Sequence, residues 1–113
     1  REMNIVNRSA ITVLFRKPFI DWHNGLMPEM PLNQDMLRES VTYLIADLSG
    51  DIDKVLRKHY KEIFENELFQ MWEDENDWPV KLSYKLFNEW FSVEVSGFVF
   101  DICKNRLEGS NID

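Results

Sequence analysis

Apolar side chains recur at the helical period between residues 51 and 72, while charged side chains occupy the opposite side of the same stretch. The apolar stripe consists of Ile52, Val55, Leu56, Tyr60, Ile63, Phe64, Leu68 and Met71. This pattern predicts an amphipathic helix of about six turns that covers a hydrophobic core. Either Ser49 or Asp51 can cap its first turn, because both side chains carry an oxygen that accepts hydrogen bonds from free backbone amides.

Three further segments have the composition or the two-residue period of β-strands. Residues 10–16 alternate between apolar and polar positions, and residues 41–48 form a nearly continuous apolar run that predicts a well-buried strand. Residues 92–102 return to the two-residue period, with Gly97 marking a bulge. We expect the second half of this last strand to be buried on both faces.

Helical and irregular segments complete the chain. Residues 82–91 place apolar and aromatic side chains at helical spacing, which predicts a second, shorter helix. A short helical turn is expected over residues 33–38. The acidic run at residues 73–77 predicts a loop, because negative charge opposes the C-terminal end of a helix dipole.

Residues 17–33 are predicted to form a long loop, because they contain Pro18, Gly25, Pro28 and Pro31. The loop also carries the apolar or aromatic residues that we expect to bind a partner, which are Trp22, His23, Met27 and Met30. A methionine-bearing loop suits a contact surface for another protein. The alternative is a flap whose apolar side chains cover one end of the core.

Together these elements predict an α+β domain that spans residues 1–113. Its small antiparallel or mixed sheet of about three strands packs on the long helix, with the shorter helix beside it. The length of 113 residues and the 44% hydrophobic composition suit a single globular domain. A sheet this small leaves an open face or edge, so we expect the chain to form a homodimer or another homo-oligomer.

Two ionisable residues interrupt the apolar stripe of the long helix. They are His59 and Glu67, which lie about 12 Å apart along the helix axis and so cannot act directly as a pair. A buried carboxylate or imidazole must be hydrogen-bonded or change its pKa. Each residue is therefore either a satisfied polar group of the core or a functional group.

Signatures of known enzyme classes are absent: the sequence has no P-loop, no dinucleotide-binding glycine motif, no zinc-protease motif and no nucleophile elbow. If the protein were an enzyme, His23 with Asp21 beside it would act with Glu67 or Asp101 as acid or base, and His59 is a further catalytic candidate. The pattern favours a non-enzymatic function. Neither a metal site nor a cofactor is predicted, and the lone Cys103 is expected to be a structural thiol in a strand end.

The charge balance limits the classes of partner. Thirteen basic and twenty acidic side chains leave a net charge of −7, which weighs against nucleic-acid binding, because that requires a cationic surface. The acidic run at residues 73–77 is either a solvated loop, or a cation site or docking patch for a basic partner. No stretch reaches the roughly 18 apolar residues of a membrane span, and no signal peptide is evident, so we expect a soluble, cytoplasmic protein that does not bind membranes.

Several short segments between about residues 40 and 102 resemble a family of small bacterial proteins of unknown function. They are Thr42-Tyr43-Leu44-Ile45-Ala46-Asp47, IFENEL at 63–68, Trp72, Trp78-Pro79, FNEWF at 87–91 and Phe100-Asp101. The resemblance implies a bacterial cytoplasmic domain. It carries over no activity and gives no residue a role.

Three functions remain open from the sequence. The favoured one is a small acidic interaction module that binds another protein. A basic effector protein is one such partner. The second is a small-molecule enzyme or ligand binder with a pocket between helix and sheet, lined by His59, Tyr60, Glu67 and Trp90. The third is a structural subunit of a homo-oligomer.

Overall fold

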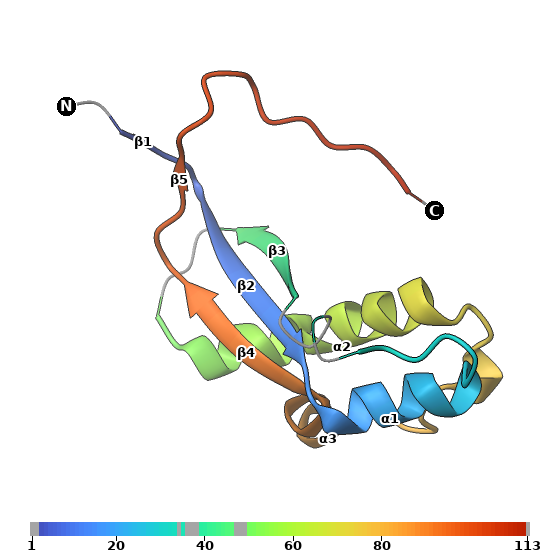
Figure 1. The fold of residues 1–113 in the computed structure, drawn as a ribbon. Coiled ribbons are helices and arrows are strands. Elements are labelled where there is room, and N and C mark those ends of the chain that lie inside the picture. Colours follow the sequence, from blue (N-terminus) through green and yellow to red (C-terminus); the bar gives the residue numbers. More distant parts are fainter. Residues whose placement is uncertain (1–2, 34, 36–38, 47–49, 113) are drawn as a thin grey trace.

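A three-stranded antiparallel sheet and a long helix form the body of the protein in the computed structural model (Figure 1). The structure describes residues 3–33, 35, 39–46 and 50–112. Strand β2 (Arg8–Phe15) lies at the centre of the sheet, between β3 (Ser40–Ala46) and β4 (Phe91–Ser96). The predicted α+β class is therefore confirmed, and the sheet is antiparallel throughout the described strands.

Helix α2 (Ile52–Met71) covers one face of this sheet, as the periodicity predicted. The strand register aligns Ile11 with Tyr43 and Val95 on that face. Ile63, Phe64 and Leu68 of the helix are buried against it. The opposite face of the sheet is polar in part, and the hydroxyl groups of Thr12 and Thr42 are hydrogen-bonded there at 2.9 Å.

The beginning of α2 is set by local chemistry. Gly50 has a φ of 99°, which is a left-handed conformation that glycine adopts without a steric penalty. The side chain of Asp51 then accepts a hydrogen bond from the backbone amide of Asp53 at 3.0 Å. Of the two predicted caps, Asp51 is confirmed, whereas Ser49 lies outside the described residues.

Helix α1 (Lys17–Leu26) replaces the first part of the predicted loop over residues 17–33. The prediction was wrong there because Pro18 lies in the first turn of the helix, where its missing amide would have no partner in any case. Gly25 lies in the last turn. The irregular chain begins only at Met27, whose backbone amide donates to the carbonyl of His23 at 2.9 Å.

Helix α3 (Tyr84–Trp90) confirms the second, shorter helix. Ser83 caps it by accepting a hydrogen bond from the amide of Leu86 at 3.1 Å. Together with α1, α3 closes one end of the core (Figure 1). Aromatic rings from five elements meet at this end, and the members that are almost fully buried are Phe19, Phe64, Phe87 and Phe91.

Strand β3 is less buried than its apolar sequence predicted. Leu44 retains 47% of its exposed surface, because β3 is an edge strand and α2 covers only one of its faces. The prediction of a well-buried strand is therefore wrong for the face of β3 that carries Leu44. The predicted strand end at residues 47 and 48, and most of the helical turn predicted over residues 33–38, lie outside the described residues.

The strand predicted over residues 92–102 is divided near Gly97. Its first half is β4, whereas its second half leaves the main sheet as β5 (Phe100–Asp101) and pairs with β1 (Asn4–Ile5). Phe98, Phe100 and Ile102 are exposed, so the expected burial on both faces is wrong. Cys103 is likewise an exposed free thiol and not a buried one.

Candidate functional site

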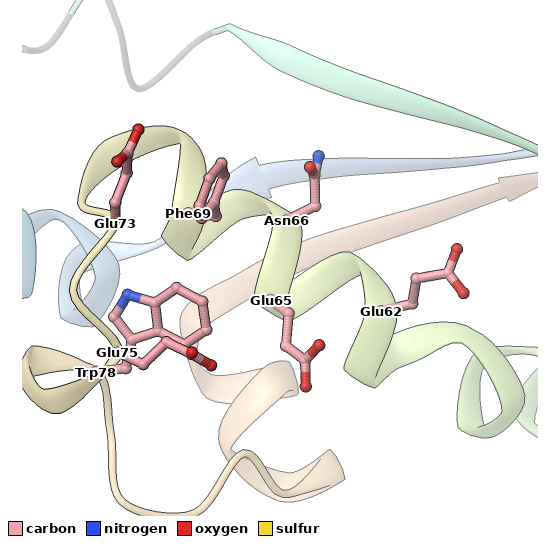
Figure 2. A pocket seen from close by; sticks show the side chains of 7 residues that line it. All are labelled: Glu62, Glu65, Asn66, Phe69, Glu73, Glu75 and Trp78. Atoms are coloured by element: carbon pink, nitrogen blue, oxygen red, sulfur yellow. The ribbon is translucent and has the colours of Figure 1, made fainter. Parts of the chain in front are cut away.

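A groove lined by glutamates and two aromatic rings lies beside the outer side of α2 (Figure 2). It has a volume of about 570 Å³, and its lining residues are Glu62, Glu65, Asn66, Phe69, Glu73, Glu75 and Trp78. Four of these residues lie on one face of α2, because helical positions three or four apart are neighbours. They are Glu62, Glu65, Asn66 and Phe69. The chain turns back after α2, so Glu75 and Trp78 form the opposite wall.

The opposite wall is held by the indole groups of three tryptophans. Trp78 donates from Nε1 to the carbonyl oxygen of Trp72 at 2.8 Å. Trp72 donates in turn to a carboxylate oxygen of Asp77 at 3.0 Å, and Trp22 of α1 donates to the carbonyl of Asp77 at 2.8 Å. These bonds tie the segment after α2 to two helices, so the groove is formed before any ligand arrives.

The acidic run at residues 73–77 forms part of this wall. The helix ends at Met71, so the run is outside it, as the dipole argument predicted. Within the run, Glu75–Asp77 forms a single 3₁₀ turn, η2. Asp74 caps this turn by accepting a hydrogen bond from the amide of Asn76 at 3.0 Å. The predicted loop is thus a defined turn whose acidic side chains remain exposed.

No glutamate of the groove forms an ion pair with another described residue. The two ion pairs of the described residues lie elsewhere, between Lys17 and Asp21 at 2.7 Å and between Arg57 and Asp53 at 2.8 Å. Two lysines, at positions 61 and 81, line an adjoining cavity of about 500 Å³ that shares Glu65, Glu75 and Trp78 with the groove. Among the described residues that line the groove itself, none is basic.

Exposed aromatic surface lies among these carboxylates. Phe69 retains 38% of its exposed surface, and the ring of Trp78 is half-buried. Lysine and arginine side chains can place their apolar stems on such surfaces while their charged ends meet carboxylates. No three His, Cys, Asp or Glu side chains among the described residues come together as a metal site requires. The groove thus has the chemistry to bind an extended organic cation.

Sequence reasoning did not identify this groove as a unit. It singled out the acidic run, but it placed Glu62 and Glu65 only among the charged side chains opposite the apolar stripe of the long helix. The signal that could have found the site is Phe69, an aromatic residue on the polar side of an otherwise regular amphipathic helix. The position of Trp78 against that face could not be predicted, because it depends in part on a hydrogen bond from Trp22 to the carbonyl of Asp77, which is 55 positions away.

The four residues predicted to bind a partner do not form one surface. Trp22 packs against Phe19 and Trp90, with ring centroids 5.4 and 6.1 Å apart. His23 is buried, and its Nδ1 lies 3.0 Å from the side-chain oxygen of Asn24. Only Met30 is largely exposed, whereas Met27 is half-buried. Trp22 does not line the groove, but its indole supports the opposite wall through the hydrogen bond to the carbonyl of Asp77.

Glu67 is a buried carboxyl group that is hydrogen-bonded to Tyr43. It is 3% exposed and accepts a hydrogen bond from the hydroxyl group of Tyr43, which itself accepts one from Asn66 at 2.9 Å. Burial raises the pKa of Glu67 above its ordinary value, and the bond from Tyr43 opposes that rise. Burial also raises the pKa of Tyr43, so this tyrosine stays protonated and donates.

His59 lines a separate cavity of about 260 Å³ between β3 and α2, together with Tyr43. The predicted pocket of His59, Tyr60, Glu67 and Trp90 is not assembled. The rings of Tyr60 and Trp90 pack instead into the aromatic core.

The residues proposed for catalysis are also separated. Asp21 pairs with Lys17 on the surface of α1. Asp101 lies in β5, at the end of the molecule opposite α1 (Figure 1), where its carboxylate accepts a bond from the amide of Cys103 at 2.8 Å. Within the described residues no hydrogen bond or ion pair joins either histidine to Glu67 or to Asp101.

None of the described helices has the length and apolar character needed to cross a membrane. Comparison of the chain with protein-family models, with curated proteins and with solved structures yields no match. The resemblance to a family of small bacterial proteins therefore stays a prediction.

Proposed function

We propose that the protein is an interaction module whose acidic groove binds an extended basic segment of another protein. The observation that supports this most strongly is the set of glutamates around Phe69 and Trp78 that form no ion pair with any basic side chain in the described part of the chain. Their charge is complementary to lysine and arginine. The two rings add apolar contact that a simple solvated charge run would not offer.

The dimensions of the groove define the expected ligand. Glu62 and Phe69 are seven residues apart on α2, which corresponds to about 10 Å along the helix axis. An extended peptide rises about 3.3 Å per residue, so about three or four of its residues fit along this wall. We therefore expect a segment with two or three basic residues within about four positions, of which at least one stacks on Trp78.

The expected affinity is modest because every contact is exposed to solvent. A surface ion pair contributes about 0.2–1 kcal/mol, and a cation–π contact contributes about 0.5–1 kcal/mol. The preformed wall limits the entropy that binding removes. Binding should weaken as salt is added, since the Debye length falls to about 8 Å at physiological ionic strength.

The proposal is tested by titrating the protein with a short arginine-containing peptide and following tryptophan fluorescence at low and high salt. The groove variant is Glu65→Gln with Glu75→Gln, which keeps side-chain size but removes two charges. The matched control is Glu89→Gln with Glu94→Gln, two exposed glutamates outside the groove, which gives the same change in net charge. We expect the groove variant to raise the dissociation constant about tenfold and the control about twofold or less.

Two results would contradict this proposal. If both double variants weaken binding equally, the peptide senses net charge and not the groove. If the basic peptide binds no better than an acidic peptide of the same length, the groove does not select cations.

A second candidate, a small-molecule site, is supported by the cavity between β3 and α2. Tyr43 lines this cavity together with His59 and bonds to the buried Glu67, so a ligand there would meet polar groups on an apolar wall. Binding that is lost in Glu67→Gln, with the fold retained, is the result expected of this candidate. A screen that finds ligands with equal affinity for the variant would exclude Glu67 from the site.

A further inference from the structure

The two-stranded ribbon of β1 and β5 projects from the main sheet, at the end away from α1 and α3 (Figure 1). Its strands are antiparallel, with Asn4 opposite Asp101 and Ile5 opposite Phe100. A bond of 2.9 Å from the amide of Val6 to the carbonyl of Val99 continues the pairing toward the body of the protein. Each described strand of the ribbon has only one neighbour, so each has an unpaired edge.

One face of this ribbon is apolar and open to solvent. The cross-strand pair of Ile5 and Phe100 lies on it, and the two-residue period of extended chain directs the flanking apolar residues to the same side. The members of this apolar ribbon face and their exposed fractions are Met3 45%, Ile5 52%, Phe98 77%, Phe100 53% and Ile102 81%. Of the intervening positions, Asn4 and Asp101 are polar, whereas Val99 is apolar and half-buried.

An exposed apolar face of this kind is stabilised when another surface packs on it. A two-stranded ribbon is marginally stable in water when nothing packs on it. Contiguous exposed apolar patches of this kind mark contact sites. The residues of the ribbon face are not part of the hydrophobic core, so their exposure serves no packing role within the body of the chain.

We propose that the apolar ribbon face is covered by the same face of a second copy of this chain. An apolar face without a charge pattern is self-complementary, and a two-fold contact places identical surfaces against each other. The five side chains expose on the order of 500 Å² in one copy, so a pair of copies buries at most on the order of 1,000 Å², which is the lower limit for a specific contact and fits a weak, concentration-dependent dimer.

The distribution of charge is consistent with this contact. The described residues of the ribbon and the chain that flanks it carry three basic side chains, Arg8, Lys104 and Arg106, against Asp101 and Glu108. The whole chain carries a net charge of −7. The ribbon is therefore nearly neutral. A contact through the ribbon keeps the acidic bodies of the two copies apart, so their electrostatic repulsion is small. This inference does not depend on the acidic groove, which lies on α2.

The oligomeric state of the full chain tests the proposal by sedimentation over a wide concentration range. We expect a concentration-dependent dimer, and Phe100→Ser with Ile102→Ser should raise its dissociation constant at least about 100-fold. The matched control is Met30→Ser with Val80→Ser, since these residues are more exposed as a pair but lie outside the ribbon. Circular dichroism verifies that both variants are folded.

A second measurement locates the contact. Phe100→Cys in a Cys103→Ser background should form a disulfide between two copies under mild oxidation, whereas Val80→Cys in the same background should not. A wild-type chain that stays monomeric at every concentration overturns the proposal. So does a dimer that Phe100→Ser with Ile102→Ser leaves intact, and so does cross-linking that is equal at positions 80 and 100.

Discussion

Tyr43→Phe removes a single hydroxyl group, the one that connects Asn66 to the buried carboxyl of Glu67. The ring stays in place, so packing changes little, but Glu67 loses the donor that the structure gives it. A hydrogen bond to a charged group contributes about 1.5–3 kcal/mol, whereas a bond between neutral groups contributes about 1 kcal/mol. We therefore expect the variant to lose about 2 kcal/mol of unfolding free energy when Glu67 is ionised, and about half of that when it is protonated.

The pH dependence of this loss follows from the pKa of Glu67. Burial raises the folded-state pKa, so the folded protein holds the proton more tightly than the unfolded chain. The corresponding stability is complete below the ordinary glutamate pKa of about 4.3 and is lost as the pH rises through the raised folded-state pKa. Removing Tyr43 takes away the bond that opposes this rise, so the pKa of Glu67 rises further and stability falls over a wider pH range.

Urea unfolding monitored by tryptophan fluorescence measures both quantities when it is repeated over a pH series that starts below the ordinary glutamate pKa of about 4.3 and ends at about pH 8. Tyr84→Phe is the control, because its hydroxyl group donates to the exposed Asp53 at 3.0 Å and not to a buried carboxyl. We expect Glu67→Gln to abolish most of the pH dependence of the Tyr43→Phe effect. A cost of Tyr43→Phe that is the same across the whole pH series would rule out this role of Glu67, and so would a cost that adds without coupling to that of Glu67→Gln.

Three other substitutions test the interpretation of the fold. Asp51→Ala removes the cap of α2 and should lower the free energy of unfolding by about 1 kcal/mol in thermal melting, whereas an unchanged melting temperature would show that the cap is dispensable. Phe64→Ala opens a cavity in the aromatic core and should cost about 3–5 kcal/mol in urea unfolding, far more than Phe69→Ala in the partly exposed groove. Trp22→Phe removes the indole donor to Asp77 and should accelerate amide hydrogen exchange at Asp77 and Trp78; unchanged exchange there would show that Trp22 does not support the groove wall.

The elements with a strong internal period could be predicted from the sequence. Helix α2 follows its apolar stripe from Ile52 to Met71, and β2 and α3 lie close to their expected positions. Each of these elements packs one face on a single core, so hydrophobic spacing alone specifies its type.

The wrong predictions share a different cause, which is dependence on neighbours. Pro18 breaks a helix in most positions but begins one here, because Arg16 leads the chain directly from β2 into α1. The apolar residues from Phe98 to Ile102 resemble a core strand, yet they lie in a ribbon that leaves the sheet. Local sequence does not report which elements a segment will meet.

The candidate groove was half predicted for the same reason. The acidic run at residues 73–77 was recognised from composition, and Trp22 was singled out, although for a contact role. Their connection requires the indole of Trp22 to reach Asp77, which is 55 positions away. A contact of that sequence separation leaves no local pattern.

The position of β2 at the centre of the sheet has a consequence during synthesis of the chain. Its two partners are β3 and β4, and residues 16–90 separate β2 from β4. At elongation rates of about 5–20 residues per second, one edge of β2 stays unpaired for some 4–15 s while these residues are made. Over that interval the apolar stretch from Ala10 to Phe15 is exposed to other nascent chains, so a chaperone that holds extended apolar segments should bind the nascent protein until residue 96 has emerged.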